Sequence, residues 1–342
     1  MIRLLHPLAL ILVVLLGTDL HAAGQLRAGT AAGTELLIPV GARDIALGGS
    51  SIATTSGLSA LHWNPAGLAR ASSRSNALFS TMSYLADIRV NYIAASTRLA
   101  SAGSVGLHVK TLDFGQIPVT TETSPDGTGA TFSPTFLTLG LTYAQTLTDR
   151  ITLGATGHYI VNRIERASAT GLSFSAGLQY ANLADIPGLD LGVTLKHIGT
   201  RMQFDGPALL RSGQLDGLRR PNAVYKVEAS SADLPSTFEI GLGYHRAHAG
   251  PGQVRLTSLF RHDNFAADQW KLGSEYIYNE FFSIRGGFDY AAATATDYLF
   301  GTSFGFGLQL NVGSFEDVKL DYAYTTVDHF DALNTFTFQV GF

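Results

Sequence analysis

The chain has 342 residues with a formal net charge of -4, only 15% charged residues, 37 glycines, 20 phenylalanines, 13 tyrosines and no cysteine. The lack of cysteine excludes a disulfide scaffold and a cysteine metal site, and the mild acidity argues against a nucleic-acid partner, which needs a concentrated basic face. Abundant glycine and aromatic residues with little lysine and glutamate are typical of β-structure.

The first predicted element is a secretory signal peptide over residues 1–23. Arg3 lies in a short basic start, an apolar run covers residues 8–16, and small residues follow at Ala22 and Ala23. These parts in this order are typical of an export signal, which we expect to be cleaved after Ala22 or Ala23. A membrane anchor is the alternative, but the run is far shorter than the roughly 20 residues that a spanning helix needs.

Residues 24–75 show no strand alternation and are rich in glycine, alanine, serine and threonine. A short helix is expected over residues 57–63, and the turn formers from Asn64 to Gly67 should end it. A large barrel leaves a lumen that side chains cannot fill. We therefore expect this segment to form an N-terminal plug or hatch.

Residues 76–342 are predicted to form an all-β fold, a transmembrane antiparallel β-barrel of about 14 strands, plus or minus two. From about Phe132, segments alternate between large apolar and small or polar residues, as in residues 137–143. No apolar run reaches helix-spanning length, so a membrane form must be a closed barrel. Residues 76–113 alternate weakly, and strand positions there depend on turn residues. Turns are predicted at residues 102–103, 148–149, 187–188, 250–252, 279–280 and 313–314. A soluble β-sandwich is the alternative, but it would expose fewer aromatic residues.

The residues predicted to face the lumen carry both signs of charge, which argues against an ion-selective porin. A solvated lumen joined to the plug by ion pairs is favoured over a substrate-binding cluster. These residues are His108, Lys110, His158, Lys196, Glu239, His245, Lys271, Glu275, Arg285, Asp289, Lys319 and Asp321.

Residues 202–236 interrupt the strand pattern and are predicted to form a long extracellular loop. This segment contains Arg211, Arg219 and Arg220. We interpret the three arginines as a solvated loop surface rather than an anion site.

The chain ends on a strand whose two faces differ. One face carries Phe336, Phe338, Val340 and Phe342, and the other carries small and polar residues. A barrel-closing strand must present an apolar face to lipid and a free edge to the first strand. We interpret these four residues as a membrane-insertion signal for the barrel-assembly machinery. An ordinary amphipathic strand that happens to be last is the alternative.

No motif indicates catalysis, a cofactor or a metal site. The chain contains no Gly-x-Ser-x-Gly elbow, no His-Glu-x-x-His pair and no Walker-type loop. A hydrolase assembled from separate strands is conceivable, but nothing in the sequence favours it. The prediction is a protein that is not an enzyme and binds no cofactor.

Residues 38–49 and 59–68 carry a recognisable motif. They contain a Pro-x-Gly-Ala-Arg segment that runs into Gly48 and Gly49, and a later Trp-Asn-Pro-Ala-Gly-Leu segment. This arrangement resembles the PorV/PorQ family of outer-membrane barrels, itself similar to the FadL-type (OMPP1/FadL/TodX) transporters. Leu47 replaces a common methionine, His62 replaces a common tyrosine, and residues 54–57 lack an acidic pair.

The resemblance implies a FadL-like barrel whose N-terminal plug contains the motif. The glycines would let the backbone lie close to the barrel wall, Asn64 and Pro65 would form a sharp turn, and Trp63 would be a packing anchor. Structural packing is favoured over direct ligand contact. The motif residues are Gly41, Ala42, Arg43, Gly48, Gly49, Trp63, Asn64, Pro65 and Gly67.

Two functions follow from the resemblance. The first is a non-enzymatic component of type IX protein secretion, which binds or shuttles exported cargo through the cargo's C-terminal domains. The alternative is a FadL-like passive transporter of long-chain fatty acids or other hydrophobic small molecules. In both cases the protein would lie in the bacterial outer membrane, with lipid and the barrel-assembly machinery as partners. Type IX components and cargo, or hydrophobic molecules, would be the further partners.

Overall fold

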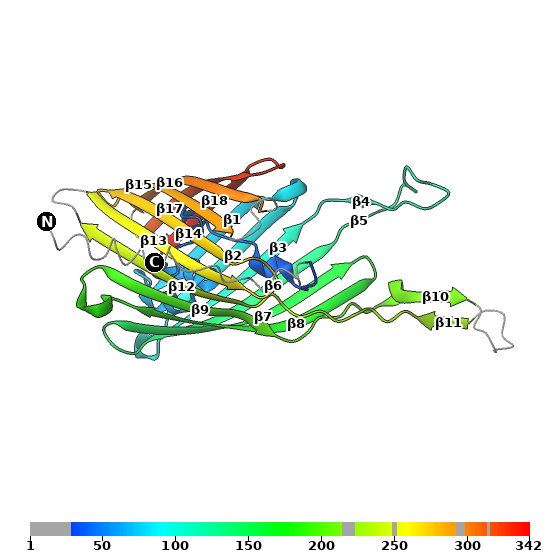
Figure 1. Cartoon of the computed structure of the whole chain (residues 1–342), viewed down its shortest axis with the longest axis horizontal. Helices are drawn as coiled ribbons and strands as arrows, with labels where there is room; N and C mark the ends of the chain where they lie inside the picture. Colours follow the sequence, from blue (N-terminus) through cyan, green and yellow to red (C-terminus); the bar gives the residue numbers. More distant parts are fainter. Residues whose placement is uncertain (1–28, 214–222, 248–251, 292–297, 313–314) are drawn as a thin grey trace.

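The computed structural model describes residues 29–213, 223–247, 252–291, 298–312 and 315–342. Antiparallel strands close into a barrel of 14, in the order β1-β18-β17-β16-β15-β14-β13-β12-β9-β8-β7-β6-β3-β2 (Figure 1), which confirms the predicted fold class. The barrel strands are β1 Ser75–Ser83, β2 Arg89–Arg98, β3 Ser104–Asp113, β6 Thr135–Thr146, β7 Ile151–Ile164, β8 Ala167–Tyr180, β9 Leu189–Gly199, β12 Thr237–Ala247, β13 Gly252–Asp263, β14 Gln269–Tyr278, β15 Phe282–Ala291, β16 Phe300–Val312, β17 Phe315–Val327 and β18 Leu333–Gly341. The predicted signal peptide, residues 1–23, lies outside the described residues.

The two ends of the barrel differ in the length of their connections. One end has short connections, at residues 99–103, 147–150, 181–188 and 279–281, and also holds the C-terminal residue, Phe342. The other end includes the long connections 114–134 and 200–236. We call these the turn end and the loop end. The turns predicted at 102–103, 148–149, 187–188 and 279–280 are confirmed, whereas 313–314 and most of 250–252 lie outside the described residues.

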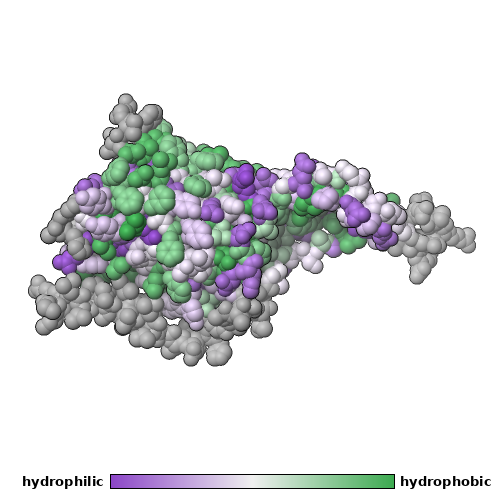
Figure 2. All heavy atoms as spheres, turned by 90° about the horizontal axis from the view of Figure 1, so that it is seen from above, coloured by the Kyte–Doolittle hydropathy of each residue, from purple (hydrophilic) through white to green (hydrophobic). Residues whose placement is uncertain are grey.

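Large apolar side chains point outward from nearly every barrel strand. Leu141 is 59% exposed, Phe174 66% and Phe336 57%, and Figure 2 shows hydrophobic residues spread over one face of the barrel. An apolar surface of this extent is stable only against lipid or another protein. The alternation predicted from the sequence therefore corresponds to an outer face that suits a membrane.

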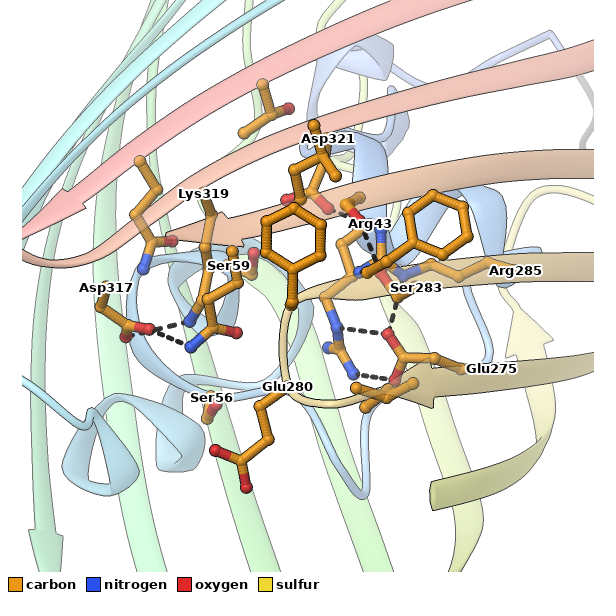
Figure 3. Close-up of a pocket in the computed structure, with 18 of the residues that line it drawn as sticks. Arg43, Ser56, Ser59, Glu275, Glu280, Ser283, Arg285, Asp317, Lys319 and Asp321 are labelled. Atoms are coloured by element: carbon orange, nitrogen blue, oxygen red, sulfur yellow. Dashed lines mark hydrogen bonds and ion pairs between the residues drawn. The ribbon is translucent and has the colours of Figure 1, made fainter. Parts of the chain in front are cut away.

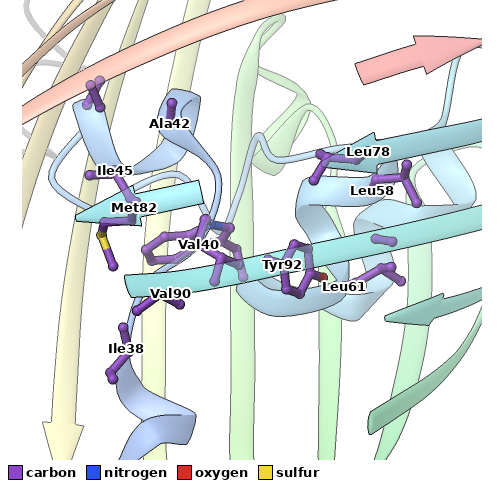
Figure 4. Close-up of a cluster of buried hydrophobic side chains, with 14 of the residues drawn as sticks. Ile38, Val40, Ala42, Ile45, Leu58, Leu61, Leu78, Met82, Val90 and Tyr92 are labelled. Atoms are coloured by element: carbon purple, nitrogen blue, oxygen red, sulfur yellow. The ribbon is translucent and has the colours of Figure 1, made fainter. Parts of the chain in front are cut away.

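Strands β1 and β2 carry apolar residues on both faces, and their inner faces also bury polar residues such as Ser80, which explains the weak alternation of residues 76–98. Phe79 points outward and is 46% exposed, while its neighbour Leu78 points inward and is buried. The inward residues of these strands, including Met82 and Tyr92, pack in one hydrophobic cluster with residues of the N-terminal segment (Figure 4). Because this part of the interior is not wetted, its inner face has no need of polar residues.

Two hairpins extend from the loop end beyond the barrel (Figure 1). The first pairs β4 Ile117–Pro118 with β5 Thr131–Phe132. The second lies in the predicted loop 202–236 and pairs β10 Leu210–Gly213 with β11 Ala223–Lys226, after the short helix η9 Pro207–Leu209. The interruption of the barrel pattern is thus confirmed, but the segment contains regular structure because it forms its own hairpin.

The N-terminal segment, residues 29–74, folds into short helices joined by turns. They are η3 Thr34–Leu37, α2 Ala42–Ala46, η4 Gly57–Ser59, α3 Ala60–Trp63 and η5 Pro65–Arg70. The expected helix over 57–63 is present as η4 and α3, and it ends at Asn64 as predicted. Single-turn helices η6 Leu85–Asp87, η7 Ala100–Ala102 and η8 Leu183–Asp185 occur in barrel connections. No helix among the described residues is long and apolar enough to cross a membrane.

Candidate functional site: the N-terminal segment and two interior cavities

The N-terminal segment contacts inward-facing residues from many barrel strands. Helix α2 packs against β15, β16, β17 and β18, and η5 packs against β6, β7 and β8. The backbone N–H of Ala42 donates to Thr337 Oγ1 at 2.8 Å, which ties α2 to the terminal strand β18. At the other end of the segment, Lys110 Nζ on β3 donates to the carbonyl oxygen of Ile38 at 3.1 Å. The segment is therefore held from several sides of the barrel.

Asn64 joins the segment to strand β8 as well as forming the predicted sharp turn. Its Oδ1 accepts from Ala66 N at 3.2 Å, which caps η5, and Pro65 is the first residue of that helix. Its Nδ2 donates to the carbonyl oxygens of Ile52 at 2.8 Å and of Leu178 at 3.1 Å. A side-chain amide can make these contacts together because it offers two donors and an acceptor.

Arg43 forms the only ion pairs that link the described part of the segment to the wall. Its Nη2 donates to Glu275 Oε2 at 2.9 Å and its Nε to Glu275 Oε1 at 3.3 Å (Figure 3). Glu275 is buried and also accepts from Arg285 Nε at 2.7 Å and Arg255 Nη1 at 3.3 Å. Burial acts to lower the pKa of Arg43, but the carboxylates of Glu275 and Asp44 raise it above its ordinary value. Arg43 is thus charged at every physiological pH.

The glycines of the motif have different roles. At Gly48, with φ of +65°, an added Cβ would lie 3.0 Å from the backbone nitrogen of Phe288, so this residue lies against the wall as expected. A Cβ added to Gly49 would lie 2.9 Å from the ring of Trp63. Gly41 does not lie against the wall, so the expectation is wrong for this residue. A Cβ added there would have Ser59 Oγ as its nearest atom, at 3.7 Å, and it is the φ of +84° that requires glycine. Gly67 packs against the carbonyl group of Thr55 within the segment itself.

Glycines on the barrel strands make room for the segment. At Gly154 on β7 an added Cβ would lie 2.6 Å from Ala66 N and closer still to the Pro65 carbonyl group. Backbone atoms cannot move aside as a flexible side chain can. We expect Gly154→Val to displace η5 and to lower the stability by about 1–3 kcal/mol. The displacement should appear as faster cleavage of the N-terminal segment by a protease.

Gly157→Val is the matched control for this variant. Gly157 lies on the same strand, and an added Cβ would meet only the ring of Phe174, at 3.7 Å. Equal protease resistance of both variants would contradict the close packing of η5 on the wall.

Trp63 is the packing anchor expected for the segment. Its ring is buried, and Nε1 donates to the carbonyl oxygen of Val40 at 3.0 Å. Lys196 Nζ lies 5.7 Å from the ring centroid, within range of a cation–π contact. The side chain thus joins the two halves of the segment and also contacts strand β9.

A cavity of about 320 Å³ lies towards the loop end, between the segment and the wall. Its apolar lining includes Leu36, Ile38, Trp63 and Phe300. Burial, followed by the charges of Lys110 and Lys196, holds the pKa of His62 in this lining well below its usual value, so the ring is neutral. A second cavity, of about 310 Å³, lies towards the turn end, and its lining is mainly polar and charged (Figure 3). We call them the loop-end cavity and the turn-end cavity.

The predicted lumen-facing residues are mostly buried rather than solvated. Lys196 pairs with Glu239 at 2.8 Å, and both side chains are less than a tenth exposed. His108, Lys110 and His158 are also buried. The solvated lumen predicted from the sequence is therefore wrong for these positions, because the N-terminal segment and neighbouring side chains cover them. Gln179 donates to the carbonyl oxygens of Ile52 and Thr55. The sequence did not indicate this contact, because a polar residue on the inner face of a barrel strand is ordinary.

The four aromatic-face residues of the terminal strand lie as the alternation indicates. Phe336, Phe338 and Phe342 are outward and 57%, 44% and 58% exposed, and Val340 is on the same face. Strand β18 pairs with β1 on one side and β17 on the other, so it closes the barrel. Of the three loop arginines, Arg211 is exposed, and Arg219 and Arg220 lie outside the described residues.

Comparison with known proteins gives one family and one fold. Residues 21–189, about half of the chain, match the family described as type IX secretion system protein PorV. No curated protein matches the chain.

The solved structures that share the fold include the following three. The toluene transporter TodX of Pseudomonas putida is 12% identical with a TM-score of 0.55, covering 92% of this chain and 98% of TodX. The toluene transporter TbuX of Ralstonia pickettii is 14% identical with a TM-score of 0.51, covering 89% of this chain and 98% of TbuX. A FadL homologue of Pseudomonas aeruginosa is 13% identical with a TM-score of 0.51, over 89% of this chain and 98% of the homologue.

The matched family and these structures are secretion and transport proteins of the outer membrane, and the aromatic outer face of the barrel suits the same lipid environment. Barrels of this kind place short turns in the periplasm and long loops outside the cell, so we expect the turn end to face the periplasm and the loop end to face the outside. The chain belongs to the PorV family of outer-membrane β-barrels and shares its fold with the FadL-type channels.

Proposed function

We propose that the protein is a non-enzymatic component of type IX secretion that binds exported cargo at its loop end. The match to the PorV family supports the secretion system. The observation that supports cargo binding is the hairpin formed by β10 and β11, which extends outside the barrel at the loop end (Figure 1).

The hairpin has the properties of a strand-addition site. In the part of the chain that the structure describes, β10 and β11 pair only with each other, so each has an edge without a strand partner. Leu210 is 47% exposed, Val224 70% and Tyr225 42%. Unpaired backbone groups beside exposed apolar side chains favour the addition of an extended segment from another protein. An exported C-terminal domain would supply such a segment.

We further propose that residues 29–74 act as the plug of the barrel. Contacts with strands on several sides of the interior and the buried pair of Arg43 with Glu275 support this role. The nine motif residues would then serve chiefly to fold and dock the plug, while the terminal Phe336, Phe338, Val340 and Phe342 would direct membrane insertion. Barrel-assembly machinery, type IX components and cargo would be the partners.

Charges on the hairpin should weaken cargo capture. We expect Val224→Asp combined with Tyr225→Asp to reduce binding of a cargo C-terminal domain at least about tenfold, or 1.4 kcal/mol. Pull-down with purified protein measures this. Ile117→Asp on the β4–β5 hairpin, 37% exposed at the same end, is the matched control. Equal loss in both variants, or no loss in the first, would refute the assignment.

FadL-like transport is the second candidate, and the apolar loop-end cavity favours it. Its volume of about 320 Å³ and its lining by Leu36, Ile38 and Phe300 suit a small hydrophobic molecule. The two functions separate in one deletion strain. Loss of cargo secretion with unchanged uptake of a labelled hydrophobic substrate supports the secretion function, and the opposite result supports transport.

A further inference from the structure

The turn-end cavity has a neighbour of about 280 Å³. The two share part of their lining, namely Ser56, Arg70, Gln253 and Arg255. The shared residues come from the N-terminal segment and from β13, so the two cavities lie next to each other between the segment and the wall. We call the two cavities together the turn-end vestibule.

The charged groups of the vestibule are sorted by depth. The acidic side chains at its back, Asp190, Glu275, Asp317 and Asp321, are between 1% and 9% exposed. The basic side chains in front are more accessible: Arg43 is 18% exposed, Lys319 29% and Arg255 31%, and Arg70 is exposed. Arg285, at 6%, is the buried exception among the bases, and Glu280 is the exposed exception among the acids. The surface that a ligand would meet is therefore mainly cationic.

The buried carboxylates already have their partners. Glu275 accepts from three arginines, and Asp321 accepts from Arg285 Nη1 at 2.5 Å. Asp317 accepts from Lys319, Gln309 and Ser72. These bonds hold the carboxylates in place at the back of the vestibule. The carboxylates therefore do not compete with a ligand for the accessible N–H groups of the basic residues.

The accessible arginines retain donors that these acids do not use. Arg255 uses Nη1 for Glu275 and Nη2 for Gln253, and a guanidinium has five N–H groups in all. Arg70 Nη1 donates to Gln179 Oε1 at 3.4 Å, and among the described residues Arg70 makes no ion pair. Guanidinium N–H groups bind carboxylates well, and two N–H groups of one arginine often donate to the same carboxylate.

We propose that the turn-end vestibule binds an acidic, extended peptide segment of a periplasmic protein. The barrel wall surrounds the vestibule, so headgroups of the surrounding membrane do not reach it. Its bases are distributed along two adjoining cavities, which matches several carboxylates on one chain better than a single small anion. The inference is independent of cargo binding at the loop end, since the two sites lie at opposite ends of the barrel.

A labelled hexaglutamate peptide tests the proposal with the full-length protein in detergent micelles. Fluorescence anisotropy should show binding that weakens as salt rises, because surface charges are screened. Hexaglutamine and hexalysine should not bind. The double variant Arg70→Gln with Lys319→Gln should weaken hexaglutamate binding at least about tenfold.

Arg150→Gln is the matched control, since Arg150 is also at the turn end but pairs with Asp185 on the outer rim. It removes one positive charge and should leave binding unchanged. For each variant, unheated and heated samples are compared by gel electrophoresis, because a folded barrel changes its migration when it is heated. Equal binding of hexaglutamine, equal loss in Arg150→Gln, or full displacement of the peptide by equimolar inorganic phosphate would overturn the proposal.

Discussion

Replacing Glu275 by glutamine is expected to lower the free energy of unfolding by about 3–5 kcal/mol, as removal of one partner from a buried ion pair does. Glu275 is 1% exposed and accepts from Arg43, Arg255 and Arg285. Glutamine has nearly the same shape, but it leaves three positive charges close together without their common anion. Because Arg43 belongs to the N-terminal segment, release of this segment should come before loss of the barrel.

Two measurements check this expectation. Urea titration in lipid vesicles gives the unfolding free energy, and brief trypsin treatment reports whether the segment is cleaved at Arg43 or Arg70. Glu280→Gln is the matched control because it removes the same charge from the exposed turn that follows β14. If Glu275→Gln is as stable and as resistant as Glu280→Gln, the ion pair does not hold the segment.

Replacing Phe338 by arginine should prevent stable insertion of the barrel. Phe338 is 44% exposed near the middle of β18, and its cross-strand partners Phe79 and Leu320 are also outward and exposed. A charge on the lipid face at the midplane of a barrel costs about 2–4 kcal/mol. The strand also closes the barrel onto β1, so the loss affects the final pairing step.

The amount of heat-modifiable barrel in outer-membrane fractions measures this effect. Phe338→Leu keeps an apolar side chain at the same position and should assemble normally. Normal assembly of Phe338→Arg would show that this face of β18 does not contact lipid.

The interior contacts could not be predicted from the sequence to the same extent as the strands. The strand at residues 135–146 was predictable because one face meets lipid and the other does not, which leaves a period of two in the sequence. The pattern fails at β1 and β2 because the N-terminal segment covers their inner faces with apolar residues such as Val40. The same covering is why the lumen residues proved buried.

The partner of Arg43 shows most clearly which contacts the sequence does not reveal. The motif marked Arg43 through its resemblance to a family, and no local pattern indicated a partner. Glu275 lies 232 residues further along the chain, and it was one of a dozen charged residues expected to face the lumen. Which of them meets Arg43 depends on barrel closure and on the path of the segment inside it.

The sequence by itself determined the barrel, its approximate strand number, its outer face and its closing strand, because local alternation and turn residues are sufficient to indicate them. Only the tertiary structure decided where the N-terminal segment docks, which charges are buried, and that the turn-end vestibule presents its bases in front of its acids. These features arise from contacts between residues far apart in the chain, whose geometry exists only after the barrel has closed around the segment.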